Sequence, residues 1–160
     1  MYRLMGMSIE GNVWLESIEW PDRPSCISLG EGAMLDRNVT LLATCEHARI
    51  RIRRRVYINR NTIIDVQQEL EIDEETMIGP GCYLTDHDHA FTKDTAPGAG
   101  PLIVEPTRIG KRCWLGAHVT VLKGVTIGDG TVVGAGSVVT KSLPPGVLAV
   151  GSPARIIREL

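Results

Sequence analysis

The chain has 160 residues and a formal net charge of -2 at pH 7, and its aromatic residues are only three Trp, three Tyr and one Phe. This length corresponds to one domain, or to one domain with a short appendage. The charge excludes a general nucleic-acid binder, which needs a strong basic excess, and no apolar run reaches the ~18–20 residues of a membrane span.

Residues 1–28 lack the repeat that marks the rest of the chain, and they contain two of the three tryptophans, Trp14 and Trp20. We expect them to form a lead-in strand or cap for the regular structure that follows. The segment begins MYRLMGMSIEGNVW, without a charged head and an apolar stretch behind it, so no signal peptide is expected. The four cysteines form no CxxC pair, which predicts neither a zinc site nor a disulfide framework. These features together predict a soluble, reduced, cytoplasmic protein.

From residue 29 onward, an aliphatic residue recurs at every sixth position. Three groups of three come first, and six consecutive matches follow: Leu29, Leu35, Leu41; Ile52, Ile58, Ile64; Ile72, Ile78, Leu84; and Ile109, Leu115, Val121, Ile127, Val133, Val139. Four positions after the aliphatic residue there is usually a compact one, such as Cys113 or Ser137. Period six fits neither a 3.6-residue helix nor a long alternating strand, and a β-sandwich would show turn signals every 8–12 residues. The pattern instead predicts a solenoid of short strands and tight turns with a narrow aliphatic interior.

Two interruptions of this pattern are notable. Arg49, Arg51, Arg53, Arg54 and Arg55 alternate in part with isoleucines, which favours an exposed, solvated face but leaves a patch for an anionic ligand open. The longest break covers residues 85–108 and is long for a compact domain, where such loops are often binding or lid segments.

Two stretches resemble a known family. Residues 78–91, IGPGCYLTDHDHAF, and residues 132–160, VVGAGSVVTKSLPPGVLAVGSPARIIREL, resemble the galactoside, maltose and polysaccharide O-acetyltransferase branch of the hexapeptide-repeat acyltransferases. The resemblance implies an all-β fold: a left-handed parallel β-helix solenoid of hexapeptide repeats with one protruding loop and a short C-terminal tail or helix. It predicts a cap at 1–28, a β-helix at 29–144 with an inserted loop at 85–108, and a tail at 145–160. It also implies a homotrimer with active sites between subunits.

The resemblance places a catalytic histidine in the TDHDHAF segment. A hydroxyl attacks a thioester well only if a base takes its proton, and neutral imidazole (unperturbed pKa ~6.5) is suited to this at pH 7. Alignment on Leu84 puts His89 at the family's catalytic position, and His87 at a variable one. Asp86 or Asp88 could orient the imidazole, although aspartates here could also simply bond backbone amides of a turn.

The resemblance further assigns binding residues. Acetyl-CoA is the implied acyl donor, with the Ala117 amide as oxyanion donor, and Asn59 matches a sugar-binding asparagine of the galactoside branch. The acidic residue that this branch supplies from an N-terminal helical region has no counterpart, which disfavours a simple galactoside or maltose acceptor. Eight residues are expected at the coenzyme: Trp114, Ala117, Gly134, Ala135, Thr140, Lys141, Arg155 and Arg158. The cations among them suit phosphates.

The sequence thus predicts an acetyl-CoA-dependent O-acetyltransferase that acts on a sugar or polysaccharide precursor by direct transfer, without a metal. Three alternatives stay open. The same scaffold could N-acetylate an amino sugar or another amine, or it could be a non-catalytic β-helix scaffold subunit. A zinc enzyme of the γ-carbonic anhydrase type is disfavoured, because its three spaced histidines are absent.

Overall fold

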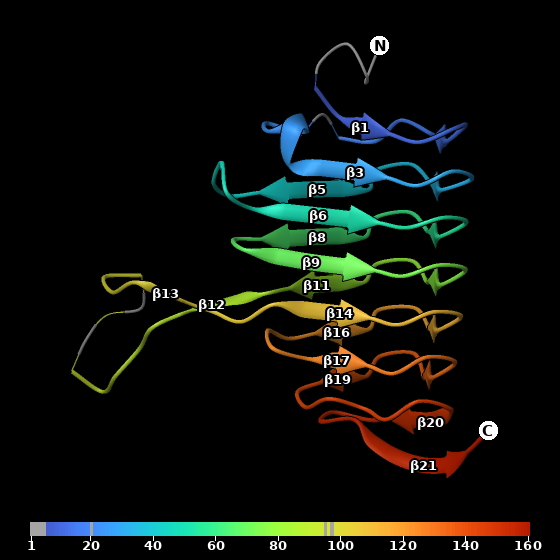
Figure 1. Ribbon diagram of the computed structural model, residues 1–160. Coiled ribbons are helices and arrows are strands. Elements are labelled where there is room, and N and C mark those ends of the chain that lie inside the picture. The colour runs from blue at the N-terminus through green and yellow to red at the C-terminus, as the bar shows by residue number, and fades with distance from the viewer. Residues whose placement is uncertain (1–5, 20, 95, 97) are drawn as a thin grey trace.

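The computed structural model describes residues 6–19, 21–94, 96 and 98–160. Nearly all of its regular structure is β, in three sheets that run along a straight stack of coils (Figure 1). The six-stranded sheet has the order β1 (Ser8–Ile9), β3 (Ile27–Leu29), β6 (Arg49–Ile52), β9 (Glu69–Ile72), β14 (Thr107–Ile109) and β17 (Thr126–Ile127). The five-stranded sheet has the order β19 (Val138–Val139), β16 (Thr120–Val121), β11 (Tyr83–Thr85), β8 (Ile63–Val66) and β5 (Thr40–Ala43).

The eight-stranded sheet completes each coil. Its order is β2 (Trp14–Leu15), β4 (Met34–Leu35), β7 (Tyr57–Ile58), β10 (Met77–Ile78), β15 (Trp114–Leu115), β18 (Val132–Val133), β20 (Val147–Val150) and β21 (Arg155–Glu159). Successive coils pair in parallel, so the chain passes from the six-stranded to the eight-stranded and then to the five-stranded sheet before it climbs to the next coil. No helix in the described part of the chain is long and apolar enough to cross a membrane.

The hexad pattern of the sequence explains this architecture. The aliphatic residues of equivalent hexads pair in register across coils, as Ile58, Ile78 and Leu115 do. Every one of these corner residues is buried, and so are compact residues four positions later such as Cys113 and Ser137. Burial of small and branched side chains in repeating columns supplies the hydrophobic stabilisation that aromatic residues provide in bulkier cores. The predicted parallel β-helix of hexapeptide repeats is confirmed.

Glycines allow the coils to approach closely at the corner between the eight- and five-stranded sheets. A Cβ atom on Gly116 would lie 2.7 Å from the backbone nitrogen of Ala135 in the next coil, and one on Gly79 would lie 2.6 Å from the carbonyl carbon of Gly116. Any side chain at Gly79 or Gly116 would push the backbones of neighbouring coils apart. The high glycine content therefore reflects coil-to-coil stacking as well as turns.

The two ends of the solenoid differ from the sequence expectation in detail. In the N-terminal segment, Ile9 pairs with Leu29 and Leu15 with Leu35, so the six-residue register extends further back than we expected. A short 3-10 helix, η2 (Pro24–Cys26), joins this first coil to the next. At the other end the tail forms strand β21, antiparallel to β20, and not a helix.

The arginine-rich stretch forms inter-coil ion pairs. Arg51 pairs with Glu69, and Arg53 Nε lies 2.9 Å from Glu71 Oε1. Arg54 and Arg55 pair with acidic residues of the following coil in the same way. Since these charges are already neutralised by neighbours, the stretch is better described as a solvated face than as a patch for an anionic ligand.

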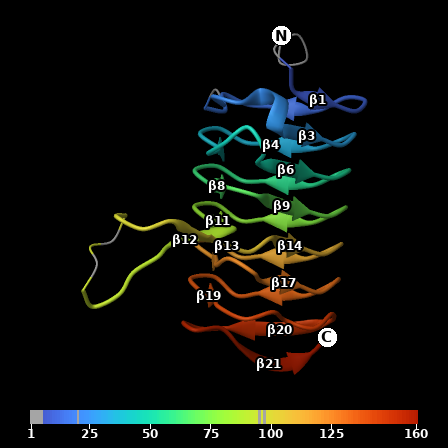
Figure 2. The same cartoon turned by 60° about the vertical axis from the view of Figure 1, so that its left-hand side comes forward.

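The long break in the repeat is a protruding hairpin. Strand β12 (His87–His89) leaves the solenoid directly after β11, and β13 (Leu102–Val104) returns antiparallel to it (Figures 1 and 2). His87 is opposite Val104 and His89 is opposite Leu102. The fold therefore presents both candidate histidines on the first strand of this hairpin, with His87 at its base and His89 further out.

Candidate functional site

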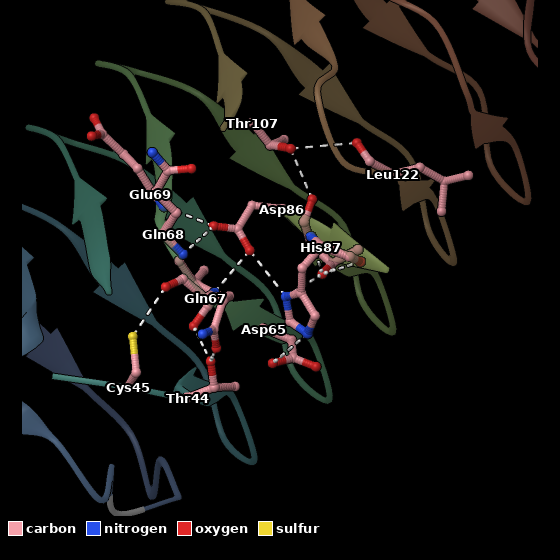
Figure 3. A network of polar contacts seen from close by, with 12 residues as sticks. Thr44, Cys45, Asp65, Gln67, Gln68, Glu69, Asp86, His87, Thr107 and Leu122 are labelled. Atoms are coloured by element: carbon pink, nitrogen blue, oxygen red, sulfur yellow. Dashed lines mark hydrogen bonds and ion pairs between the residues drawn. The ribbon is translucent and has the colours of Figure 1, made fainter. Parts of the chain in front are cut away.

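Asp86 anchors the base of the hairpin to the coil before it. Its carboxylate is fully buried and accepts three backbone hydrogen bonds, from the N–H groups of Gln67, Gln68 and Glu69 at 2.8, 2.6 and 2.7 Å (Figure 3). These amides lie at the turn between β8 and β9, where the chain passes from one sheet to the next. Bonds from N–H groups to an ionised acceptor are among the stronger hydrogen bonds in proteins.

The same carboxylate orients His87. His87 Nδ1 lies 3.0 Å from Asp86 Oδ1, and the imidazole is only 11% exposed. Its other nitrogen, Nε2, lies 3.9 Å from Asp65 Oδ1 (Figure 3). A histidine bonded to a carboxylate at one nitrogen has a fixed ring orientation, which is the arrangement that catalytic bases use.

Asp65 is a site residue that the sequence reasoning missed. It pairs with Thr85 of the next coil, directly before Asp86. Tyr83 donates its hydroxyl proton to Asp65 Oδ2 at 3.1 Å, and burial together with the Asp65 charge raises the pKa of that tyrosine. No described residue donates a hydrogen bond to the buried Oδ1 of Asp65. One available signal was its position: an aspartate directly after the corner residue Ile64, one coil before the histidine loop.

A surface cavity adjoins Asp65. It measures about 250 Å³ and is lined by Asp22, Arg23, Leu42, Ala43, Thr44 and Asp65. The cavity lies on the face of the five-stranded sheet, on the N-terminal side of the hairpin. It offers the charged side chains of Asp22, Arg23 and Asp65 and the hydroxyl of Thr44, which suits a polar ligand with several hydrogen-bonding groups.

His89 lies further out on the hairpin. Its side chain is exposed and makes no hydrogen bond or ion pair with the described residues. Alternate residues of a strand point to the same face, so His89 and His87 share one face of β12 and Asp88 points the other way. The structure thus brings Asp86 to His87, and it places His89 two residues beyond that pair.

The residues predicted around the pantetheine arm align at one corner of the β-helix. Ala117 follows β15 and Ala135 follows β18, at equivalent places in consecutive coils, and Gly136 N–H donates to Ala117 C=O at 2.8 Å. The Ala117 N–H donates to no described residue. Gly134, beside Ala135, has no room for a Cβ, which would lie 2.6 Å from a Val150 methyl group. Trp114 is 55% exposed on the adjoining eight-stranded sheet.

The predicted phosphate-binding residues lie near the C-terminal end of the stack. Thr140 and Lys141 directly follow β19, and Arg155 and Arg158 lie in β21. All four side chains are exposed. Arg155 and Arg158, both in β21, use their guanidinium groups only for backbone carbonyls, those of Ala154 and Glu159. Neither has an acidic partner among the described residues, so both keep charge available for a ligand.

A single chain does not bring the predicted catalytic residues and the predicted coenzyme-binding residues together. Asp86, His87 and His89 lie at the corner between the five- and six-stranded sheets. Ala117 and Ala135 lie at the corner between the eight- and five-stranded sheets, so the width of the five-stranded sheet separates the two sets. Asn59 lies at the alanine corner too, where its Oδ1 accepts the Arg60 N–H at 2.8 Å.

Two further groups bear on the chemistry. Burial raises the pKa of the Cys82 and Cys113 thiols, so neither is an activated nucleophile. Among the described residues, no three His, Cys, Asp or Glu side chains are grouped so that they could hold a metal ion.

Comparison with known proteins finds one matching family model and several similar acetyltransferases. The family described as bacterial transferase hexapeptide (six repeats) matches residues 106–141. A galactoside O-acetyltransferase of Escherichia coli K12 is 40% identical over 111 residues, which are 69% of this chain and 54% of the relative. The E. coli K12 protein WbbJ, named for O-acetyl transfer in lipopolysaccharide biosynthesis, is 38% identical over 112 residues, 65% of this chain and 57% of that one.

A solved structure supports the same assignment. The solved structure of a galactoside acetyltransferase in complex with coenzyme A matches with a TM-score of 0.66 and 29% identity, covering 95% of this chain and 64% of that one. The chain spans about half the length of the curated relatives that it matches. The repeat, the fold and these likenesses together show that the chain is a hexapeptide-repeat protein similar to acyltransferases of this kind, and its residues 106–141 match the family model itself.

Proposed function

We propose that the protein is an acetyl-CoA-dependent O-acetyltransferase that acts on a hydroxyl of a sugar or polysaccharide precursor. The observation that carries this proposal is the histidine-bearing hairpin, which buried Asp86 fixes by its contact with His87, together with the polar cavity that Asp65 lines. The relatives named for O-acetyl transfer, to galactosides and in lipopolysaccharide biosynthesis, support the acceptor class. The coenzyme-bound neighbour supports coenzyme A as the carrier.

In the proposed reaction His89 acts as general base. Its neutral imidazole takes the proton of the acceptor hydroxyl while the oxygen attacks the thioester carbonyl carbon. The tetrahedral oxyanion accepts a hydrogen bond from the Ala117 N–H, as a preorganised donor. The C–S bond then breaks, and the protonated histidine returns its proton to the departing thiolate. Since Cys82 and Cys113 are buried with raised pKa, direct transfer without an acyl-enzyme is favoured.

The acceptor is proposed to enter the cavity beside Asp65. Asp65, Arg23 and Thr44 on the cavity wall offer polar contacts to sugar hydroxyls. Asn59, at the other corner, would meet the acceptor from a neighbouring subunit. The coenzyme is proposed to run along Trp114, Ala117 and Ala135 toward the guanidinium groups of Arg155 and Arg158 in β21, which donate to backbone carbonyls.

The complete site is proposed to form between subunits of a homotrimer, because the histidine corner and the alanine corner are apart in one chain. The outward side chains of the eight-stranded sheet support this. They form an apolar column in cross-strand register: Trp14, Met34, Tyr57, Met77, Trp114, Val132 and Leu148. Trp14 is 66% exposed and Met77 51% exposed in the single chain. Outward positions of the six-stranded sheet carry polar and charged side chains instead, so a second copy of this chain is the expected cover for the apolar column.

Met77→Glu is expected to weaken the oligomer and the activity together. A buried unpaired carboxylate at the centre of an interface costs about 2 kcal/mol or more, which raises the dissociation constant about 30-fold. Light scattering coupled to size exclusion measures the mass at several concentrations. Thr126→Glu, on the exposed face of the six-stranded sheet, is the matched control and should keep the wild-type mass. An unchanged mass for Met77→Glu would exclude this face as the interface.

The activity itself is tested by the release of coenzyme A thiol. Purified protein with acetyl-CoA is expected to release thiol in the presence of hydroxylated glycans, and mass spectrometry should find an alkali-labile ester on the acceptor. An alkali-stable amide on an amino sugar would establish the N-acetyltransferase alternative instead. Protein that binds no acetyl-CoA would favour the scaffold alternative.

A further inference from the structure

A lysine outside the proposed catalytic set joins the hairpin to the coil after it. Lys123 lies in the turn between β16 and β17, and its side chain is only 19% exposed. Its Nζ donates to Glu105 Oε1 at 2.7 Å and lies 4.0 Å from Asp88 Oδ2. Glu105 directly follows β13, and Asp88 is the middle residue of β12. One ammonium group therefore contacts β12 and the residue that directly follows β13.

The backbone around Lys123 is built to receive Glu105. Gly124 N–H donates to Glu105 C=O at 2.9 Å, and Glu105 N–H donates to Asp86 C=O at 2.8 Å. Gly124 has φ +71°, and a Cβ there would lie 2.6 Å from Glu105 Oε2. The carboxylate of Glu105 thus lies directly over this turn, and hydrogen bonding to Glu105 raises the pKa of the Lys123 ammonium.

The contact with Asp88 bears on the two histidines. Asp88 lies between His87 and His89, and its side chain leaves β12 on the opposite face. A strand that is held on one face has a fixed rotation about its own axis, so the direction of the side chains on the other face is fixed as well. Asp86 fixes only the beginning of this strand, at the His87 end.

We propose that Lys123 is a positioning residue, which holds the β12–β13 hairpin against the β-helix and so sets the direction of the His89 imidazole. The role rests on the proposed function, in which His89 is the base. Lys123 itself contacts neither substrate in this mechanism. It acts through Asp88 and Glu105.

Lys123→Met tests the proposal, because methionine keeps much of the apolar stem and removes the charge. We expect kcat to fall between about 3- and 100-fold, since misplacement of a catalytic group by ~1 Å can cost 10² in rate. KM for acetyl-CoA should stay within twofold, because the predicted coenzyme residues lie elsewhere. Hydrogen exchange of the backbone amides in β12 and β13 should become faster, and Lys123→Arg should restore both properties in part.

Lys111→Met is the matched control. Lys111 lies in the turn between β14 and β15, at another corner of the β-helix, where its Nζ is 3.7 Å from Glu74 Oε2. The Lys111→Met substitution should leave both kcat and the hydrogen exchange of the backbone amides in β12 and β13 unchanged. The proposal would be overturned if folded Lys123→Met showed unchanged hydrogen exchange in β12 and β13. It would also be overturned if hydrogen exchange became faster while kcat stayed unchanged. If the wild-type protein acetylates no acceptor, the proposed function fails, whereas hydrogen exchange still decides whether Lys123 holds the hairpin.

Discussion

His89→Ala is expected to lower kcat by about 10²–10⁴, the usual contribution of a well-placed general base. The substitution removes an imidazole that is exposed and makes no bond to the described residues, so the fold should not depend on it. The melting temperature should stay within ~2 °C, since surface substitutions away from special features cost at most ~0.5 kcal/mol. Initial rates of thiol release at saturating acetyl-CoA measure the first effect, and thermal unfolding the second.

His87→Ala is the decisive comparison. His87 is packed between Asp86 and Asp65 at 11% exposure, so its loss is expected to lower stability by about 1–2 kcal/mol through unpaired polar groups. Its loss should lower kcat less than the loss of His89 does. If His87→Ala removes activity and His89→Ala retains the full rate, the oriented Asp86–His87 pair is the base and the assignment of His89 by resemblance is wrong.

Most of the fold could be predicted from the sequence, because the hexad repeat is a local signal with one structural solution. The aliphatic columns, which contain Ile58, Ile78 and Leu115, appear in the sequence itself as a regular six-residue spacing. The register of the first coil was missed because only two aliphatic residues, Ile9 and Leu15, carry it, and the irregular stretch with Pro21 and Pro24 follows before the next match at Leu29. A β-strand tail could not be distinguished from a helix, since RIIRE suits both an edge strand and a short helix.

The site was less accessible to sequence reasoning, because its contacts join residues of different coils. The role of Asp86 depends on three amides that lie 17 to 19 positions before it, which no motif near DHDH reveals. The role of Asp65 depends on the stacking of two coils, which brings its Oδ1 to 3.9 Å from His87 Nε2. The separation of the histidine corner from the alanine corner also follows only from the order of the three sheets.

Asp86→Ala is expected to lower the free energy of unfolding by about 3–5 kcal/mol, the largest stability effect in this region. The wild-type carboxylate accepts hydrogen bonds from three consecutive backbone amides and contacts His87, all within a fully buried environment. Alanine removes every acceptor at once and leaves a cavity. Each buried N–H group without a partner costs ~1–3 kcal/mol. The loss of stability should be smaller than three such costs added together, because local opening lets water reach some of the amides.

Asp88→Ala provides the matched control for this measurement. Asp88 is two residues away, carries the same charge and is exposed, and its ion pair with Lys123 at 4.0 Å is a surface one, so its loss should change the free energy of unfolding by no more than ~1 kcal/mol. Asp86→Asn should fall between the two variants, because its amide keeps one oxygen acceptor in the same shape. Denaturant unfolding has to be compared at one protein concentration, since assembly adds to apparent stability. Equal stability of Asp86→Ala and Asp88→Ala would mean that the turn between β8 and β9 holds without the carboxylate. The hairpin would then be anchored mainly from the Lys123 side.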